Sequence, residues 1–282
     1  MKIALITPSY SRDYDRCRIL CESVARWVDP AIDHLVIIPN RDRHLFAGLP
    51  GRSEILTVES ILPCGVHQVL EKWWLTLCSL PVRGWIMQQI VKLSAGAFLN
   101  YDAYLHADSD VMMIKPLKSE QFLSGNKLRL YKVSGEMPSD RHQLWHRNAH
   151  RMLGIAKTDQ SIYDYIAPLA SWRRDCIEKM LDTIQVVACK HWFSVLCSTL
   201  HFSEYVLYGV YVSSIPQEVS GHYEESVSLC HCSWWHDIKS VEDLKQFLDK
   251  VTEQHVAIQI QSNLGLNAEE YHIILKERGL VE

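Results

Sequence analysis

The chain has 282 residues, of which 48% are hydrophobic and 22% are charged, and its formal net charge is −4. This length and composition are typical of a globular protein with a substantial core. The acidic balance and the scattered Lys and Arg residues argue against a protein that coats nucleic acid. The sequence contains no apolar run of about 18 residues, so it predicts no membrane-spanning helix.

The N-terminal segment and the cysteines predict a cytoplasmic protein. Residues 1–8 become polar too soon for a secretory signal. The nine cysteines are odd in number and irregularly spaced, which fits reduced thiols better than a disulfide framework. We therefore expect a soluble chain in the cytoplasm.

The first half of the chain alternates short apolar runs with amphipathic stretches. Apolar runs predict strands at 3–6, 34–38 and 54–58, whereas apolar residues at helical spacing predict helices at 12–27 and 84–96. Such alternation predicts an α/β fold with a mostly parallel sheet flanked by helices.

The second half of the chain is less regular. We expect a strand at 128–133, helices at 163–170 and 172–187, a helix capped by Ser203, and a strand at 226–232. For the C-terminal segment we predict a closing subdomain, with helices at 241–251 and 268–278 and a strand at 256–260 between them.

Two aspartates one residue apart interrupt the apolar run from Tyr104 to Ile114. In an extended chain alternate side chains share a face, so Asp108 and Asp110 can project together and hold a divalent cation through oxygen atoms. A metal held in this way would suit a diphosphate. The alternative is a polar turn after a buried strand, where Asp and Ser bond the local backbone.

Three loops follow predicted strands, at residues 7–10, 39–42 and 108–110. In open α/β sheets ligands bind outside the carboxyl ends of the strands, so these loops can converge on one ligand. Ordinary turn chemistry is the alternative for the first two loops.

Polar residues on the helix at 84–96 form one face, on which Gln88, Gln89 and Lys92 are neighbours. Two amides and an ammonium group suit sugar hydroxyls and phosphate, but the solvated side of an amphipathic helix has the same pattern.

An isolated carboxylate, Glu204, stands among aromatic residues in the first turn of the helix capped by Ser203. It is either a favourable charge at the helix N-terminus or a general base with a raised pKa. His231 and His236 lie near a predicted strand end, where they would serve either as metal or pyrophosphate contacts or as structural residues.

Four motifs carry a family resemblance: Thr-Pro-Ser-Tyr at 7–10, Gly-Trp-x-x-Gln-Gln-x-x-Lys-Leu at 84–93, Asp-Ser-Asp-Val at 108–111 and Ser-Glu-Tyr-x-x-Tyr-Gly at 203–209. Over roughly residues 2 to 236 they resemble the DUF6492 group of bacterial proteins, which look like GT-A glycosyltransferases. The resemblance implies an α/β, GT-A-like (Rossmann-like) fold with a mixed C-terminal portion.

The resemblance also implies a domain organisation. Residues 1–236 would form the catalytic domain, with a nucleotide-binding half at about 1–116 and an acceptor and catalytic half at about 117–236. Residues 237–282 would form a C-terminal α/β extension packed on the same domain.

The resemblance assigns roles to particular residues. Asp108 and Asp110 would bind Mn²⁺ or Mg²⁺ across the two phosphates of a nucleotide sugar, with His231 or His236 as a third contact. Glu204 would be the base of an inverting reaction. The implied donor-binding residues are Thr7, Pro8, Tyr10, Asn40, Arg41, Gln88, Gln89, Lys92 and Ser109.

The expected activity is metal-dependent transfer of a sugar from a UDP- or GDP-sugar to a hydroxyl of a glycan or glycolipid, by family analogy a bacterial surface polysaccharide. Nucleic acid is not expected as a partner, and peripheral contact with a membrane stays open. Two alternatives stay open as well: a haloacid-dehalogenase-type phosphatase with Asp108 as nucleophile and Asp110 as general acid, and a protein that binds nucleotide or sugar without turnover.

Overall fold

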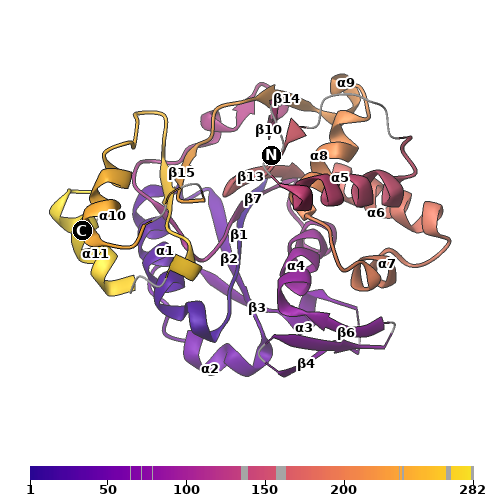
Figure 1. Cartoon of the computed structure of the whole chain (residues 1–282), viewed down its shortest axis with the longest axis horizontal. Coiled ribbons are helices and arrows are strands. Elements are labelled where there is room, and N and C mark those ends of the chain that lie inside the picture. The colour runs from indigo at the N-terminus through magenta and orange to yellow at the C-terminus, as the bar shows by residue number, and fades with distance from the viewer. Residues whose placement is uncertain are drawn as a thin grey trace.

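A five-stranded sheet forms the centre of the computed structural model (Figure 1), with the strand order β13–β7–β1–β2–β3. β1 pairs in parallel with β2 and with β7, β2 pairs in parallel with β3, and β13 runs antiparallel to β7. The carboxyl ends of β1 and β7 therefore lie at the same edge. The bounds are β1 (Ile3–Pro8), β2 (Ile32–Ile38), β3 (Glu54–Thr57), β7 (Ala103–Ala107) and β13 (Leu169–Arg173).

The described residues are 1–63, 65–70, 72–77, 79–134, 139–156, 163–234, 236, 238–264 and 268–280. Within them, no helix combines the length and the apolar character needed to cross a bilayer.

The two faces of the sheet are covered by different helices. Ala4 and Ile6 of β1 face the core shared with α4 (Gly84–Phe98), whereas Ile3 and Leu5 face the core shared with α1 (Tyr14–Trp27). This follows from the period of two along a strand. The helices predicted at 12–27 and 84–96 are thus confirmed, with α1 starting two residues later than predicted.

Further helices pack around α4 and enlarge the same core. Gly209 lies so close to the ring of Tyr165 that a Cβ atom there would stand 2.1 Å from Cγ. A larger residue at 209 is therefore excluded unless that ring moves. The helices besides α1 and α4 in this part of the chain are α2 (Arg43–Phe46), α3 (Val58–Ile61), α5 (Asp140–Leu153), α6 (Arg174–Ala188), α7 (Trp192–Ser198), α8 (Glu204–Ser213) and α9 (Gln217–Ser220).

Within the described residues, four smaller sheets lie around the central one. The first is the antiparallel sheet β4 (His67–Leu70), β5 (Trp73–Thr76) and β6 (Ser79–Arg83), and the second joins β9 (Leu123–Ser124), β10 (Lys127–Tyr131) and β14 (His222–Glu225). The others are β11 (Val133–Ser134) with β12 (Tyr163–Asp164), and β8 (Val111–Met113) with β15 (Cys230–Cys232) and β16 (Ala257–Gln259).

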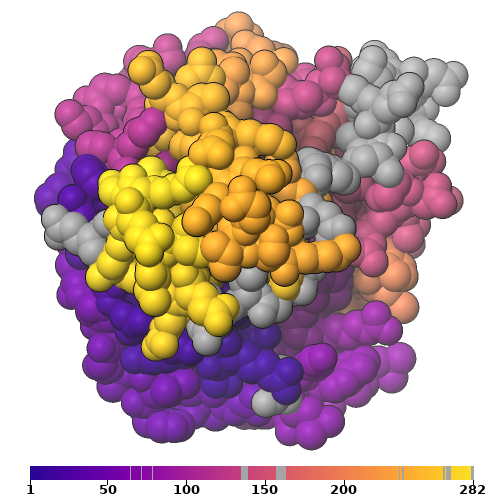
Figure 2. Space-filling model, turned by 60° about the vertical axis from the view of Figure 1, so that its left-hand side comes forward, coloured from indigo at the N-terminus to yellow at the C-terminus, as the bar shows by residue number. Residues whose placement is uncertain are grey.

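The C-terminal segment packs on the N-terminal half of the chain. Its helices α10 (Val241–Leu248) and α11 (Ala268–Glu277) share a core with Ile19 of α1 and Met112 of β8, and β16 pairs antiparallel with β8. Figure 2 shows these yellow and orange residues lying over the indigo N-terminal part. The predicted boundary at 236/237 adjoins Trp235 and Asp237, which lie outside the described residues.

The helix predicted at 163–170 is wrong. Residues 163–164 form β12, and Leu169 begins β13, which pairs with β7 from Leu169 opposite Ala107 to Arg173 opposite Ala103. Pairing with a distant strand overrides the local periodicity. The strand predicted at 226–232 shortens to β15, because its pairing with β16 covers Cys230 to Cys232 alone among the described residues.

Candidate active site

A cleft of about 930 Å³ opens at the carboxyl ends of β1 and β7. This is where a parallel α/β sheet is expected to bind a ligand. Residues from several separate segments of the chain line it, among them Pro8, Tyr10, Asp13, Gln88, Gln89, Lys92, Asp108, Ser109, Asp110, Trp145, Ser203, Glu204, Tyr205, Trp234, Gln259 and Ser262.

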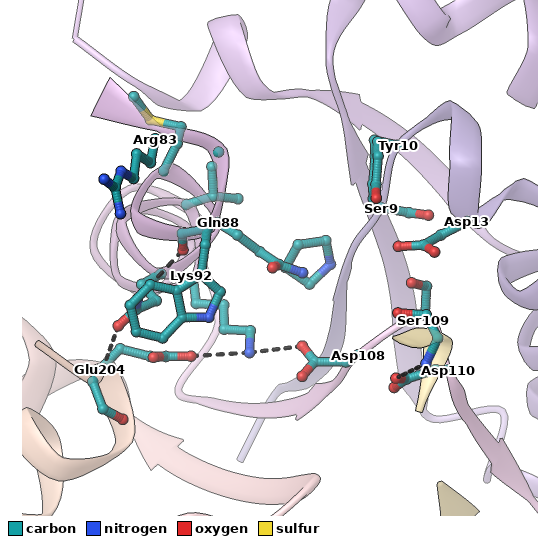
Figure 3. Close-up of a pocket in the computed structure, with 18 of the residues that line it drawn as sticks. Ser9, Tyr10, Asp13, Arg83, Gln88, Lys92, Asp108, Ser109, Asp110 and Glu204 are labelled. Carbon is teal, nitrogen blue, oxygen red and sulfur yellow. Dashed lines mark hydrogen bonds and ion pairs between the residues drawn. The ribbon is translucent and has the colours of Figure 1, made fainter. Parts of the chain in front are cut away.

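Lys92 occupies the middle of the cleft wall and is only 2% exposed. Its Nζ atom lies 2.7 Å from Asp108 Oδ1 and 3.0 Å from Glu204 Oε1, and it donates a hydrogen bond of 2.9 Å to the hydroxyl of Tyr205. Figure 3 shows the ammonium group between the two carboxylates. Lys92 thus links the end of β7 to the start of α8.

The charge of Lys92 is stabilised by its neighbours. Burial lowers the pKa of Lys92, but the opposing attraction of Asp108, Tyr205 and Glu204 leaves it well above its usual range. Burial also raises the pKa of Glu204, and Lys92 acts against that shift. The cluster therefore contains a buried cation at neutral pH.

Local capping places Glu204 in the cleft. The Ser203 hydroxyl accepts a hydrogen bond from Val206 N at 3.5 Å, as expected for an N-cap residue, which confirms the predicted helix start. Gln89 Oε1 accepts a hydrogen bond of 3.1 Å from Glu204 N, and its Nε2 donates to Trp85 O at 3.3 Å. Gln89 therefore positions the start of α8.

Asp110 is held by the C-terminal segment. Gln259 Nε2 donates to Asp110 Oδ1 at 3.0 Å, and Ser262 N donates to Oδ2 at 3.3 Å. The backbone is tied as well, because Ile260 N donates to Asp110 O at 3.1 Å. The strand β16 and the turn after it thus complete this end of the cleft.

A third carboxylate, Asp13, stands beside the two aspartates and next to the Ser109 side chain. Figure 3 shows Asp13, Ser109 and Asp110 next to one another. Burial raises the pKa of Asp13, and burial with the charge of Asp108 raises the pKa of Asp110 to about 7. Lys92 offsets part of this negative charge at Asp108, and Arg16 offsets part of it at Asp13.

The carboxylates of Asp108 and Asp110 suit a hard divalent cation whose remaining ligands are water and phosphate oxygens. Among the described residues, no group of three or more His, Cys, Asp or Glu side chains is arranged to hold a metal by itself. Mg²⁺ and similar ions are commonly bound by one or two carboxylates together with water and substrate phosphates. Asp108 and Asp110 fit a cation of that kind.

The structure brings only part of the predicted site together. Pro8, Tyr10 and Gln88 line the cleft with Lys92 and the two aspartates. Thr7 does not line it, because its side chain is buried and lies 3.0 Å from His34 Nε2.

Of the second predicted loop, Pro39 lines the cleft, whereas Asn40 and Arg41 do not. Asn40 N donates to Glu59 Oε2 at 2.9 Å, and Arg41 pairs with Asp42 at 3.7 Å. Neither contact directs these residues toward the two aspartates.

The two candidate histidines lie apart from the cleft lining. The rings of His231 and His236 pack against Phe247 of α10, at centroid distances of 4.2 Å and 5.1 Å. His231 Nε2 lies 2.9 Å from the Phe247 carbonyl oxygen. The observed packing gives both histidines a structural contact and does not place them with Asp108.

Asp13 and Gln259 are site residues that the sequence did not indicate. Asp13 follows the polar loop after β1, so its place just beyond a strand end was a usable signal. Gln259 gave none, because it reaches Asp110 from 149 residues away.

Solved structures with a similar fold include glycosyltransferases. An active-site mutant of LgtC superposes with a TM-score of 0.50 at 12% identity, over 99% of this chain and 100% of that chain. The galactosyltransferase LgtC with donor and acceptor sugar analogues gives 0.49 at 11% over 97% and 95%, and apo mouse xyloside xylosyltransferase 1 gives 0.48 at 10% over 95% and 100%. The predicted α/β, GT-A-like fold is confirmed.

Comparison by sequence gives a match to a family model. No curated protein sequence matches the chain. Residues 1–273 match a family described as a family of unknown function, DUF6492. This match covers nearly the whole chain, and the chain therefore belongs to the DUF6492 family.

Proposed function

We propose that the protein is a metal-dependent glycosyltransferase that moves a sugar from a nucleoside-diphosphate donor to a hydroxyl acceptor. The observation that carries the proposal is the cluster of Asp108, Lys92 and Glu204, with Asp110 beside it, in one cleft at the carboxyl ends of β1 and β7. The similarity of the fold to LgtC supports the same class of reaction.

Asp108 and Asp110 would hold Mn²⁺ or Mg²⁺. Bound there, the cation would act as a Lewis acid on the diphosphate. The carboxylates are ready for this role because Gln259 and Ser262 orient Asp110, while Lys92 orients Asp108.

Lys92 would stabilise the negative charge that develops on the departing diphosphate. Its ammonium group is fixed by three contacts and is held cationic, so little reorganisation is needed when charge develops. Pro8 and Tyr10, at the carboxyl end of β1, would contact the nucleoside.

Glu204 would take the proton from the acceptor hydroxyl in an inverting reaction. Its carboxylate is buried, lines the cleft and has a raised pKa, all of which suit a general base. Lys92 contacts Glu204 Oε1, and Gln89 fixes the backbone from which the carboxylate projects.

A thermal-shift screen tests the binding half of the proposal. Wild type, Asp110→Asn and the control Asp182→Asn, an exposed acid on α6, are melted with UDP, GDP, CDP or phosphate, with and without Mn²⁺. Since a ligand of the native state raises its apparent stability, we expect a Mn²⁺-dependent shift with one nucleotide in wild type and the control, but not in Asp110→Asn. Equal shifts in all three proteins, or no nucleotide shift at all, would contradict the proposal.

Turnover is tested next with nucleotide sugars that contain the nucleotide identified in the thermal-shift screen. Release of the nucleoside diphosphate from a nucleotide sugar by wild type, strongly reduced in Glu204→Gln, is the expected result. Hydrolysis of p-nitrophenyl phosphate through a phosphorylated Asp108 would instead support the phosphatase alternative. Nucleotide binding with no release would support a binding protein without turnover.

A further inference from the structure

The small sheet β4–β5–β6 exposes an apolar outer face. Leu77 and Leu80 are 87% and 85% exposed. We call the following side chains the hairpin patch: Val69, Leu70, Trp73, Leu75, Leu77 and Leu80.

The inner face of this sheet is buried against the core. Trp74 lies opposite Val82 across the β5–β6 pair, and both are buried at 3% exposure in the core shared with α4. An antiparallel sheet with one buried face normally carries polar residues on the other. Here β5 presents Trp73 and Leu75 to the outside, and exposed apolar patches of this kind mark contact surfaces.

Charge favours an anionic partner. Residues 65–85 contain Lys72 and Arg83 against one acid, Glu71, whereas the whole chain has a net charge of −4. Among the described residues, neither Lys72 nor Arg83 forms an ion pair with an acid. The Arg83 guanidinium lies 5.9 Å from the Trp73 ring centroid. Cations and indole rings beside exposed leucines are typical of a surface that lies in a membrane interface.

The hairpin patch adjoins the mouth of the cleft. Lys72, Trp73 and Arg83 also line the cleft, and Figure 1 places β4 and β6 at the margin of the molecule, on the side opposite α9. A flat partner on the patch would therefore lie next to the cleft. A second copy fits less well, because a stable protein interface uses roughly 20–30 residues a side, many more than the six of the patch.

We propose that the hairpin patch docks on an anionic lipid bilayer, with its leucines in the interfacial region and Lys72 and Arg83 on the lipid phosphates. The contact sets the cleft beside the membrane surface. This inference goes beyond the proposed function and holds whether or not the chain transfers a sugar.

Vesicle co-sedimentation of the full chain tests the docking. Wild type is expected to sediment with vesicles of phosphatidylglycerol and phosphatidylcholine more than with phosphatidylcholine alone, and less at high salt, since exposed charges are screened. The variant Leu77→Ser/Leu80→Ser should bind the anionic vesicles at least about tenfold more weakly, because moving a leucine side chain out of water favours binding and a serine side chain does not replace that contribution.

The matched control removes exposed apolar side chains elsewhere. Val186→Ser/Val219→Ser changes residues that are 75% and 59% exposed on α6 and α9, and it should bind like wild type. Thermal melting verifies that all three proteins are folded.

Three outcomes would overturn the docking proposal. One is wild type that stays in the supernatant with anionic vesicles, and another is equal binding by the leucine variant. The third is a wild-type dimer in sedimentation velocity that becomes a monomer in Leu77→Ser/Leu80→Ser, which would assign the hairpin patch to a second copy. The nucleotide shifts measured for the proposed function do not enter any of these results.

Discussion

Replacing Lys92 by Met removes a cation shared by two carboxylates of the cleft. Lys92 is 2% exposed and lies 2.7 Å from Asp108 and 3.0 Å from Glu204. Removing one partner of a buried ion pair costs about 3–5 kcal/mol, because the other charge stays buried without compensation. Asp108 retains access to solvent, so we expect about 3 kcal/mol, and the buried Glu204 accounts for most of it.

A double-mutant cycle separates this effect from lost packing. Glu204→Gln keeps the volume of the side chain, and Lys92 keeps Asp108 as a partner, so the single variant should lose about 1 kcal/mol. In Lys92→Met/Glu204→Gln no buried charge is left at position 204. The double variant should therefore be more stable than Lys92→Met alone by about 1 kcal/mol or more.

Urea unfolding followed by circular dichroism measures the three variants at neutral pH, with Lys179→Met, an exposed lysine on α6, as the control. At roughly 2 °C per kcal/mol for a chain of this size, Lys92→Met should also melt about 6 °C below wild type. Two results would refute the reasoning: wild-type stability in Lys92→Met, or a double variant that loses the full sum of the single losses.

Three other substitutions probe the positioning of the site and the packing. Gln259→Leu removes a hydrogen bond to Asp110, so titration calorimetry should find Mn²⁺-dependent nucleotide binding about tenfold weaker. Burial lowers the pKa of His222 from 6.5 to about 4. The contribution of His222 to stability is therefore present above pH 6.5 and is lost as the pH falls toward 4. Between those two pH values, wild type should lose up to about 1.4 kcal/mol more per pH unit than His222→Gln. Gly209→Ala should cost about 1–3 kcal/mol in thermal unfolding because the added Cβ meets the Tyr165 ring.

Each of these predictions has its own control or contrary result. Unchanged nucleotide affinity in Gln259→Leu would separate that side chain from the metal site. An unaltered acid slope in His222→Gln would mean that another group causes the loss of stability. Gly48→Ala adds a Cβ with no atom within 4 Å and should not melt below wild type, so an equal loss in both glycine variants would contradict the aromatic contact as the cause.

Much of the central layer could be predicted because its signals are local. The alternation of apolar runs and amphipathic stretches reports which residues face the sheet, so β1, β2, α1 and α4 were found within two or three residues of their bounds. The small sheet β4–β5–β6 was missed, since its outer face is apolar and lacks the polar alternation of an ordinary half-buried strand.

For the candidate site, single residues could be predicted from the sequence, but the contacts between them could not. The sequence indicated Lys92, Asp108 and Glu204 one at a time, each from its own segment, and could not tell that they touch. Lys92 and Glu204 are 112 residues apart in the chain. The loop at 39–42 satisfied the same strand-end rule, yet only Pro39 lines the cleft, and Asn40 and Arg41 do not.

The sequence by itself determined the α/β class, the parallel central strands and the residue types that can hold a cation and a diphosphate, because periodicity and side-chain chemistry are properties of short segments. Only the tertiary structure decided that β13 runs antiparallel beside β7, that Gln259 orients Asp110 and that His231 packs on Phe247. Those arrangements depend on contacts between distant segments, whose free energies are realised only when the whole core is assembled.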